Sequence, residues 1–233
     1  MKNIYISLFT LIFGFFTATG LSAGSVGFGV TGSIIEVNAE GGETITSSGL
    51  ADTSVRTASV QESTNIMSYY GEYVADNGLA IGFELTPGTA SLPTKSRTDT
   101  ETSVTGTAAT VANSRVFTAK AEVDDLKVAY IEAPMFAGTY VRLGLAEINV
   151  NTKEVASGNG GTYGNKTLNG VNYGVGYKTM MGSNFVLKAA YEITDFEHLR
   201  LTSSGNTAPA SSTNILEANL DTWAAKFSLG YQF

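Results

Sequence analysis

The last eleven residues of the chain read Trp223-Ala-Ala-Lys-Phe-Ser-Leu-Gly-Tyr-Gln-Phe233. Every second residue from Trp223 to Phe233 is apolar, and the residues between them are small or polar. Because successive side chains of a β-strand point to opposite faces, this stretch predicts a strand with one wholly apolar face. A tilted strand needs about 9–11 residues to cross a bilayer, so the length suits a transmembrane strand.

The same alternation recurs along the chain in seven further stretches. It is clear in four of them and weaker in three: 79–86, 139–146, 171–178 and 185–194, then 26–37, 64–74 and 123–132. In the stretch 123–132 the apolar face consists of Leu126, Val128 and Tyr130. The total of eight strands is even, as a closed bacterial barrel requires. The sequence therefore predicts an all-β fold, an eight-stranded antiparallel up-and-down transmembrane β-barrel.

The connections between the predicted strands alternate in length. Three are short and turn-rich, at 76–78, 134–138 and 181–184. The other four are long and rich in Ser, Thr, Gly and Asn, at about 38–62, 87–118, 150–168 and 196–219. An up-and-down barrel with short periplasmic turns and long outer loops has this arrangement. We therefore expect four long extracellular loops.

Residues 1–23 have the pattern of a secretory signal peptide. Lys2 supplies the positive charge, and the apolar run 4–16 is too short to span about 30 Å of hydrocarbon as a helix. Cleavage after Ala23 and cleavage after Gly20 both fit the small residues that follow. The mature barrel is then expected to span 24–233 and to lie in a bacterial outer membrane.

The composition excludes several kinds of chemistry. The chain has no Cys and a single His, which rules out disulfides, thiolate metal sites and two-histidine zinc sites. Its net charge of −7 argues against binding to nucleic acid. No cofactor and no metal site is therefore expected.

The ending Phe227-Ser-Leu-Gly-Tyr-Gln-Phe233 resembles the C-terminal signature of bacterial outer membrane barrels. The stretches 170–178 and 184–192 look like strands six and seven of the small eight-stranded families, the opacity-protein/porin-like and OmpA-type barrels. The resemblance implies a recognition signal for the barrel assembly machinery, with periplasmic chaperones as earlier partners. Its residues here are Phe227, Leu229, Tyr231 and Phe233.

Aromatic residues are expected in two girdles, where a ring meets hydrocarbon and a polar tip meets water. Tyr73, Tyr130, Tyr177 and Phe185 fall beside the short turns and are assigned to the periplasmic girdle. Tyr191 and Trp223 fall toward the other end of their strands.

The face opposite the apolar one collects charges of both signs and is assigned to the lumen. These residues are Glu72, Glu84, Lys127, Arg142, Lys178, Lys188, Glu192 and Lys226. They should pair, because an unpaired charge away from water is costly. An eight-stranded barrel is just wide enough for side chains to fill it. Two interpretations stay open: a packed plug of ion pairs, or a network whose gaps admit water and small solutes.

A catalytic site is the least supported interpretation. His198 stands beside Glu197 and near Ser203 and Ser204, so a Ser-His-Glu set is conceivable in composition, but no spacing singles it out. Asp124-Asp125 is interpreted as a rim pair. We therefore predict a non-enzymatic protein with a structural, surface-exposed role in the cell envelope. It contacts lipids and lipopolysaccharide and offers its outer loops to surface partners. The alternatives are a narrow porin-like channel for small solutes or small apolar molecules, including a lateral path between strands, and a lipid-modifying rim enzyme.

Overall fold

Antiparallel strands make up almost all of the described chain. The computed structural model describes residues 24–46, 53–104, 110–156, 162–204 and 214–233. The strands are β1 (Gly24–Thr46), β2 (Thr53–Ala75), β3 (Ala80–Ser91), β4 (Lys95–Val104), β5 (Thr110–Pro134), β6 (Thr139–Ala156), β7 (Lys166–Met181), β8 (Phe185–Phe196), β9 (Leu199–Thr202) and β10 (Asn214–Gln232). Within these residues no helix is long and apolar enough to cross a membrane.

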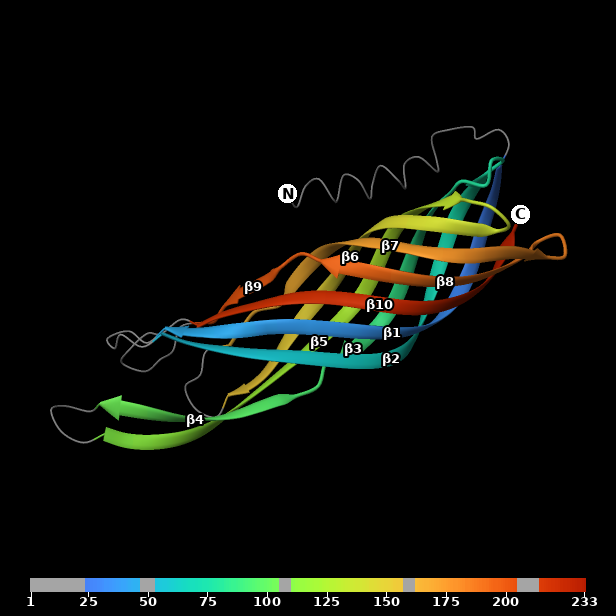
Figure 1. The fold of residues 1–233 in the computed structure, drawn as a ribbon. Helices are drawn as coiled ribbons and strands as arrows, with labels where there is room; N and C mark the ends of the chain where they lie inside the picture. Colours follow the sequence, from blue (N-terminus) through green and yellow to red (C-terminus); the bar gives the residue numbers. More distant parts are fainter. Residues whose placement is uncertain (1–23, 47–52, 105–109, 157–161, 205–213) are drawn as a thin grey trace.

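Eight of the strands close into a ring. Its order is β1-β2-β3-β5-β6-β7-β8-β10, and β10 pairs back onto β1 (Figure 1). The two remaining strands, β4 and β9, pair with β5 and β10 outside this order. Closure of the ring removes the edge strands that an open sheet would have. The predicted eight-stranded antiparallel barrel is therefore confirmed.

The register of the ladders fixes the tilt of the strands. One circuit of paired residues runs through Gly27, Glu72, Gly82, Tyr130, Gly144, Asn172, Thr194, Thr222 and Val37. It leaves β1 at Gly27 and returns to it at Val37, ten residues further along the strand. Such a stagger requires strands tilted by about 35–45° to the barrel axis.

The short turns gather at one end of the barrel, together with the C-terminus (Figure 1). Gly78, Gly138 and Gly182 each have a positive φ there, which glycine adopts without steric cost. The three predicted turns thus lie where they were expected.

The other end differs from the prediction, because strands replace most of the expected loops. The β1–β2 ladder, for example, continues to the pair Thr46–Thr53. Ser- and Thr-rich segments that alternate in polarity fit a half-exposed strand well, so composition alone made them look like loops. The remaining connections, 47–52, 105–109, 157–161 and 205–213, lie outside the described residues, as does the predicted signal peptide at 1–23.

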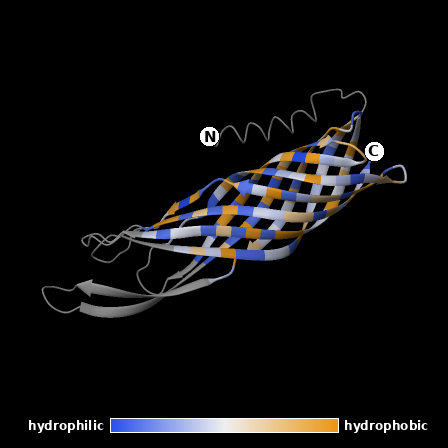
Figure 2. Ribbon diagram, in the orientation of Figure 1, coloured by the Kyte–Doolittle hydropathy of each residue, from blue (hydrophilic) through white to orange (hydrophobic). Residues whose placement is uncertain are grey.

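Large apolar side chains cover the outer face of the ring. Phe28, Leu143, Val175 and Phe227 are each more than half exposed, and apolar positions recur along the strands in Figure 2. An exposed apolar surface of this extent marks a membrane-facing side. At its outer boundary the Trp223 indole donates to Glu36 (2.7 Å) and the Tyr173 hydroxyl to Asp195 (3.0 Å). These pairs form a polar belt.

Candidate functional site: the barrel lumen

The half of the lumen nearer the short turns is filled by buried ion pairs. Lys188 Nζ lies 2.6 Å from Glu72 Oε2 and 2.9 Å from Glu132 Oε2. The Tyr130 hydroxyl donates to the same Glu72 oxygen at 3.0 Å. These residues come from β8, β2 and β5, so the contacts tie separate parts of the ring together.

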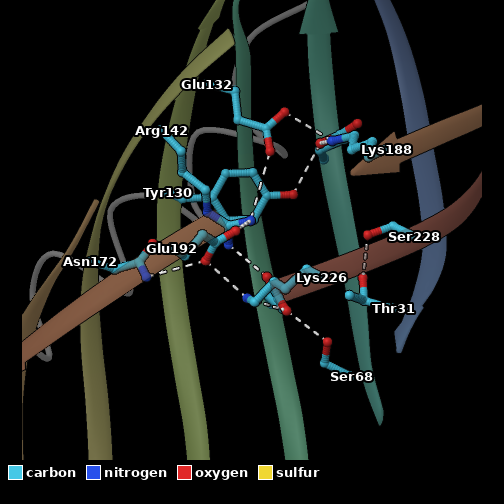
Figure 3. Close-up of polar contacts among 12 residues, drawn as sticks. Thr31, Ser68, Tyr130, Glu132, Arg142, Asn172, Lys188, Glu192, Lys226 and Ser228 are labelled. Atoms are coloured by element: carbon cyan, nitrogen blue, oxygen red, sulfur yellow. Dashed lines mark hydrogen bonds and ion pairs between the residues drawn. The ribbon is translucent and has the colours of Figure 1, made fainter. Parts of the chain in front are cut away.

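A second group of ion pairs adjoins the first (Figure 3). Arg142 lies 2.7 Å from Glu84 and 2.9 Å from Glu192, and its Nη1 is 3.8 Å from Glu132 Oε1. Lys226 bridges Glu84 (2.8 Å) and Glu192 (2.9 Å). Each of these side chains is at most 7% exposed. The two groups together form what we call the plug: Glu72, Glu84, Glu132, Arg142, Lys188, Glu192 and Lys226.

Neutral donors add hydrogen bonds to two of the carboxylates. Ser68 donates to Glu84 at 2.6 Å, and Asn172 donates to Glu192 at 3.2 Å. Buried charges are tolerated only when partners and further hydrogen bonds offset the loss of hydration. One cavity among these side chains has a volume of about 10 Å³, about the room that one water molecule needs. The side chains therefore close this half of the lumen.

Glycines let three buried tyrosines lie against the wall. A Cβ on Gly82 would lie 2.4 Å from the Tyr130 ring, and one on Gly176 would lie 2.3 Å from the Tyr140 ring. Tyr70 occupies the corresponding space beside Gly230. The Arg142 guanidinium stacks 3.7 Å from the Tyr130 ring centroid. These glycines are thus required by the close approach of aromatic side chains.

Beyond the plug, the inner side chains become mainly apolar. A continuous buried cluster comprises Ile35, Val37, Leu92, Val123, Leu126, Val128, Tyr130, Ala146, Ile148, Val150, Leu168, Leu199, Leu201, Leu220 and Ala224. Val60 and Ile66 of β2 pack against it. The lumen therefore has two chemically distinct halves, an ionic one near the short turns and an apolar one toward the outer end.

The wall beside this apolar cluster has an incomplete ladder. The pairing of β2 with β3 ends at Tyr69–Leu85. The polar belt lies six residues further along β2, at Ser63, which donates to Glu36. The ladder therefore stops before it reaches the belt. Pro87 and Gly88 (φ +117°) follow on β3, where the register with β5 shifts. Pro87 has no N–H to donate. We call this gap in backbone pairing the β2–β3 seam.

The plug contains six of the predicted lumen residues: Glu72, Glu84, Arg142, Lys188, Glu192 and Lys226. Lys178 lies apart from them, half-buried, and donates to the Gly78 carbonyl at 3.3 Å. Glu132 belongs to the plug but was not predicted. The sequence did contain a sign of this. Glu132 falls on the side of 123–132 that was assigned to lipid, and a carboxylate there is costly in hydrocarbon, so that side should have been assigned to the lumen.

Two assignments on β5 were wrong. Lys127 faces away from the lumen and pairs with Glu147 at 2.8 Å, while Tyr130, assigned to the aromatic girdle, is 2% exposed within the lumen. The strand has a register shift between Asp124 and Lys127, with Asp125 at a φ of +53°. Ile131, on the opposite side of the strand from Tyr130, is 49% exposed, and its same-side neighbours Ala129 and Ala133 are small, so the bulkier apolar side belongs to the interior.

The other predicted aromatic residues lie on the outer face or near its ends. Tyr177 and Phe185 are exposed beside the short turns, and Tyr73 lies close to the first turn on β2. Tyr191 stacks on Trp223 with 6.0 Å between ring centroids. The proposed assembly signal, Phe227, Leu229, Tyr231 and Phe233, is exposed on one side of β10 and its end. Its recognition by the assembly machinery stays a prediction.

The residues considered for catalysis contact different partners. His198 Nδ1 lies 2.9 Å from Asn219, and Glu197 accepts from Asn169. The Ser203 hydroxyl accepts from the Asn214 amide, and Ser204 bonds to Thr162. Asp124 bonds to Asn151. Among the described residues no cluster of acidic or His side chains could hold a metal ion.

No family model and no curated protein matches this sequence. Its fold is similar to outer membrane protein OprG from Pseudomonas aeruginosa, at 14% identity and a TM-score of 0.50, over 91% of this chain and 98% of OprG. Outer membrane protein AlkL, solved in lipid bilayers, is 14% identical with a TM-score of 0.45 over 93% of each chain. Outer membrane protease OmpT from Escherichia coli is 10% identical with a TM-score of 0.47, over 93% of this chain and 100% of OmpT.

At these identities the likeness shows the fold alone. The barrel fold and the exposed apolar outer face together show that the chain is an integral outer membrane β-barrel protein. Its outer face contacts membrane lipids, including lipopolysaccharide.

Proposed function

We propose that this protein is a non-enzymatic envelope protein whose barrel is closed to solutes and serves as a rigid support for its surface-exposed strands and loops. The observation that carries the proposal is the plug, whose buried ion pairs fill the half of the lumen nearer the short turns around a cavity of about 10 Å³. Its charges are held by partners from several strands, so opening an aqueous path would leave charges unpaired. The through-channel for small solutes is thereby disfavoured.

Strands at the outer end of the barrel project far enough to be accessible to surface partners. β4 and the adjoining part of β5 form a hairpin that projects beyond the ring at the lower left of Figure 1. β1 and β2 also run on together past the polar belt to Thr46 and Thr53. Surface partners would meet these strands and their connecting loops.

A swelling assay tests the closed barrel. The mature protein is refolded into liposomes, which are then diluted into isotonic solutions of small sugars. We expect swelling no faster than in liposomes without protein. Swelling that is fastest for the smallest sugar would show a size-limited aqueous path and would contradict the proposal.

A second function is favoured by the β2–β3 seam: transfer of small apolar molecules from the outer end of the lumen to the outer leaflet. The seam begins on the lipid side of the polar belt, and the side chains within are apolar. Apolar side chains can move aside for an apolar molecule without leaving a buried charge unpaired. Movement of the plug residues would leave such a charge.

Locking the seam tests this second function. Met67 and Pro87 lie two positions beyond the last β2–β3 pair, Tyr69–Leu85, on the same face of the wall, and the chain has no cysteine of its own to interfere. In vesicles with a lipopolysaccharide outer leaflet, wild type should speed uptake of N-phenyl-1-naphthylamine. Oxidised Met67→Cys/Pro87→Cys should lose this effect, and reduction should restore it. Uptake unaffected by oxidation, with the cross-link verified, would exclude the seam as the path.

A further inference from the structure

The outer face carries a hollow that the barrel's own packing leaves open. Its volume is about 830 Å³, and its floor consists of Gly32, Ala189 and Ala225, from β1, β8 and β10. Ile34, Met67 and Phe227 rise around it and are each more than half exposed. All of these side chains lie on the lipid-facing side. The hollow thus lies on the outer face of the wall, and on β2 it borders the seam at Asn65 and Met67.

Gly32 is not explained by contacts within the protein. It pairs regularly with Met67 on one side and Phe227 on the other, so it marks no bulge. A Cβ at this position would meet no heavy atom within 4 Å. The lumen-facing glycines of β1 differ, since a Cβ on Gly29 would lie 2.4 Å from the Tyr70 ring. A glycine inside a strand weakens it, and close approach of a ligand is one established reason for its presence.

A polar side chain at the edge of the hollow has no partner among the residues that the structure describes. Asn65 lines it and is exposed, in register with Ile34 on β1. Within the described chain its amide forms no hydrogen bond, whereas its neighbour Ser63 donates to Glu36. An amide at the boundary of the hydrocarbon is costly unless a donor or acceptor meets it. The hollow therefore combines an apolar trough with a free hydrogen-bonding group at its end nearest the polar belt.

We propose that this hollow binds one acyl chain of an outer-leaflet lipid, with the Asn65 amide donating to the ester carbonyl at the head of that chain. The lipid must be ester-linked and the chain must lie over Gly32. In a bilayer, burial in the hollow gains no hydrophobic free energy, because the chain leaves one apolar medium for another. Binding arises from the packing contacts of a chain against a floor without side chains and from the hydrogen bond to Asn65.

A second copy of the protein fits the hollow less well. The polar belt above it contains acidic residues, Glu36 and Asp195, which would face their counterparts across a two-fold interface. Like charges brought together in this way oppose association. A lipid ester, in contrast, offers the acceptor that Asn65 lacks.

Native mass spectrometry tests the proposal. Protein refolded in dioleoylphosphatidylcholine is extracted and delipidated in steps, and wild type should retain a single lipid after the annular lipids have gone. Gly32→Leu, which fills the trough, and Asn65→Leu, which removes the amide, should each lose it. Val141→Phe adds bulk to the lipid face of β6, away from the hollow, and should keep it. No retained lipid in wild type, or equal retention in Gly32→Leu, overturns the proposal. So does a dimer that Gly32→Leu abolishes.

A measurement in the bilayer gives an independent readout. Trp223 is the only Trp of the chain, and its ring stacks on Tyr191, which lines the hollow. Brominated-chain phosphatidylcholine should quench Trp223 strongly in wild type and in Val141→Phe, and less in Gly32→Leu and in a second filling variant, Ala225→Leu. Folding of each variant is checked by its gel mobility before and after boiling. Equal quenching in folded variants overturns the proposal.

Discussion

Arg142 on β6 lies in the lumen and contacts Glu84 on β3, with 2.7 Å between Nη2 and Oε2. One strand, β5, separates β3 from β6 in the ring, so the contact passes over the inner face of β5 and joins strands that are not neighbours. Arg142 also forms an ion pair with Glu192, and Lys226 forms a second ion pair with the same carboxylate. This single side chain therefore links three strands through the plug.

Removing Arg142 should destabilise the barrel strongly. In Arg142→Ala the carboxylates of Glu84 and Glu192 each lose a buried partner, and breaking such a pair costs about 3–5 kcal/mol. The free energy of unfolding in urea, followed by Trp223 fluorescence in detergent micelles, should fall by about this amount. Arg200→Ala is the control, since the Arg200–Glu217 pair is exposed and should cost about 0–1 kcal/mol. Equal losses would show that the plug is not essential to stability.

Replacing Lys127 should have little effect, although Lys127 was expected in the lumen. Its pair with Glu147 lies on the outer face, and each side chain is about one-third exposed. Lys127→Met should therefore change the unfolding free energy by about 0–1 kcal/mol and leave the swelling assay unchanged. A loss as large as that of Arg142→Ala would place Lys127 in the plug after all.

Adding a methyl group to Gly176 should disturb the packing of Tyr140. The new Cβ would lie 2.3 Å from the Tyr140 ring, so the ring must move, at a cost of about 1–3 kcal/mol. Gly32→Ala adds the same group where nothing lies within 4 Å and should stay within about 0.5 kcal/mol of wild type. Urea unfolding compares the two, and a Gly176→Ala variant as stable as Gly32→Ala would contradict the close contact.

Hydrogen exchange should reveal the β2–β3 seam. From Thr57 to Ser68, β2 pairs with β1 but not with β3. Amides that point toward β1 should be protected, and amides that point toward β3 should exchange faster. The alternation should be absent from 69–74, where both neighbours pair. Uniform protection through 57–68, measured by NMR in micelles, would show that the seam is closed in solution.

The fold was predictable because a single sequence shows both the alternation of the strands and the glycines of the short turns. The alternation in Trp223–Phe233 follows directly from the contrast between lipid and lumen, and the short turns contain glycines that only a turn requires. Most plug residues followed from the same parity, since Glu84, Lys188 and Glu192 share a face with small residues.

β5 escaped prediction because both of its faces are partly apolar. Tyr130 and Val128 belong to the interior, and no sequence pattern reveals that Tyr130 needs Gly82 beneath its ring or that Arg142 stacks on it. The extended strands also escaped, because Ser- and Thr-rich segments resemble loops until backbone pairing is known. The hollow around Gly32 and the β2–β3 seam depend on which strands are neighbours, which alternation alone does not specify.

Conductance across a planar bilayer tests the closed barrel most directly. Refolded mature protein, with folding confirmed by its shifted gel mobility, is compared with Arg142→Ala and Lys188→Ala at the same insertion level. The plug predicts a silent wild type, with conducting events confined to those variants that remain folded. Reproducible unitary steps in wild type, altered by the same substitutions, would show an open aqueous lumen and would contradict a closed barrel.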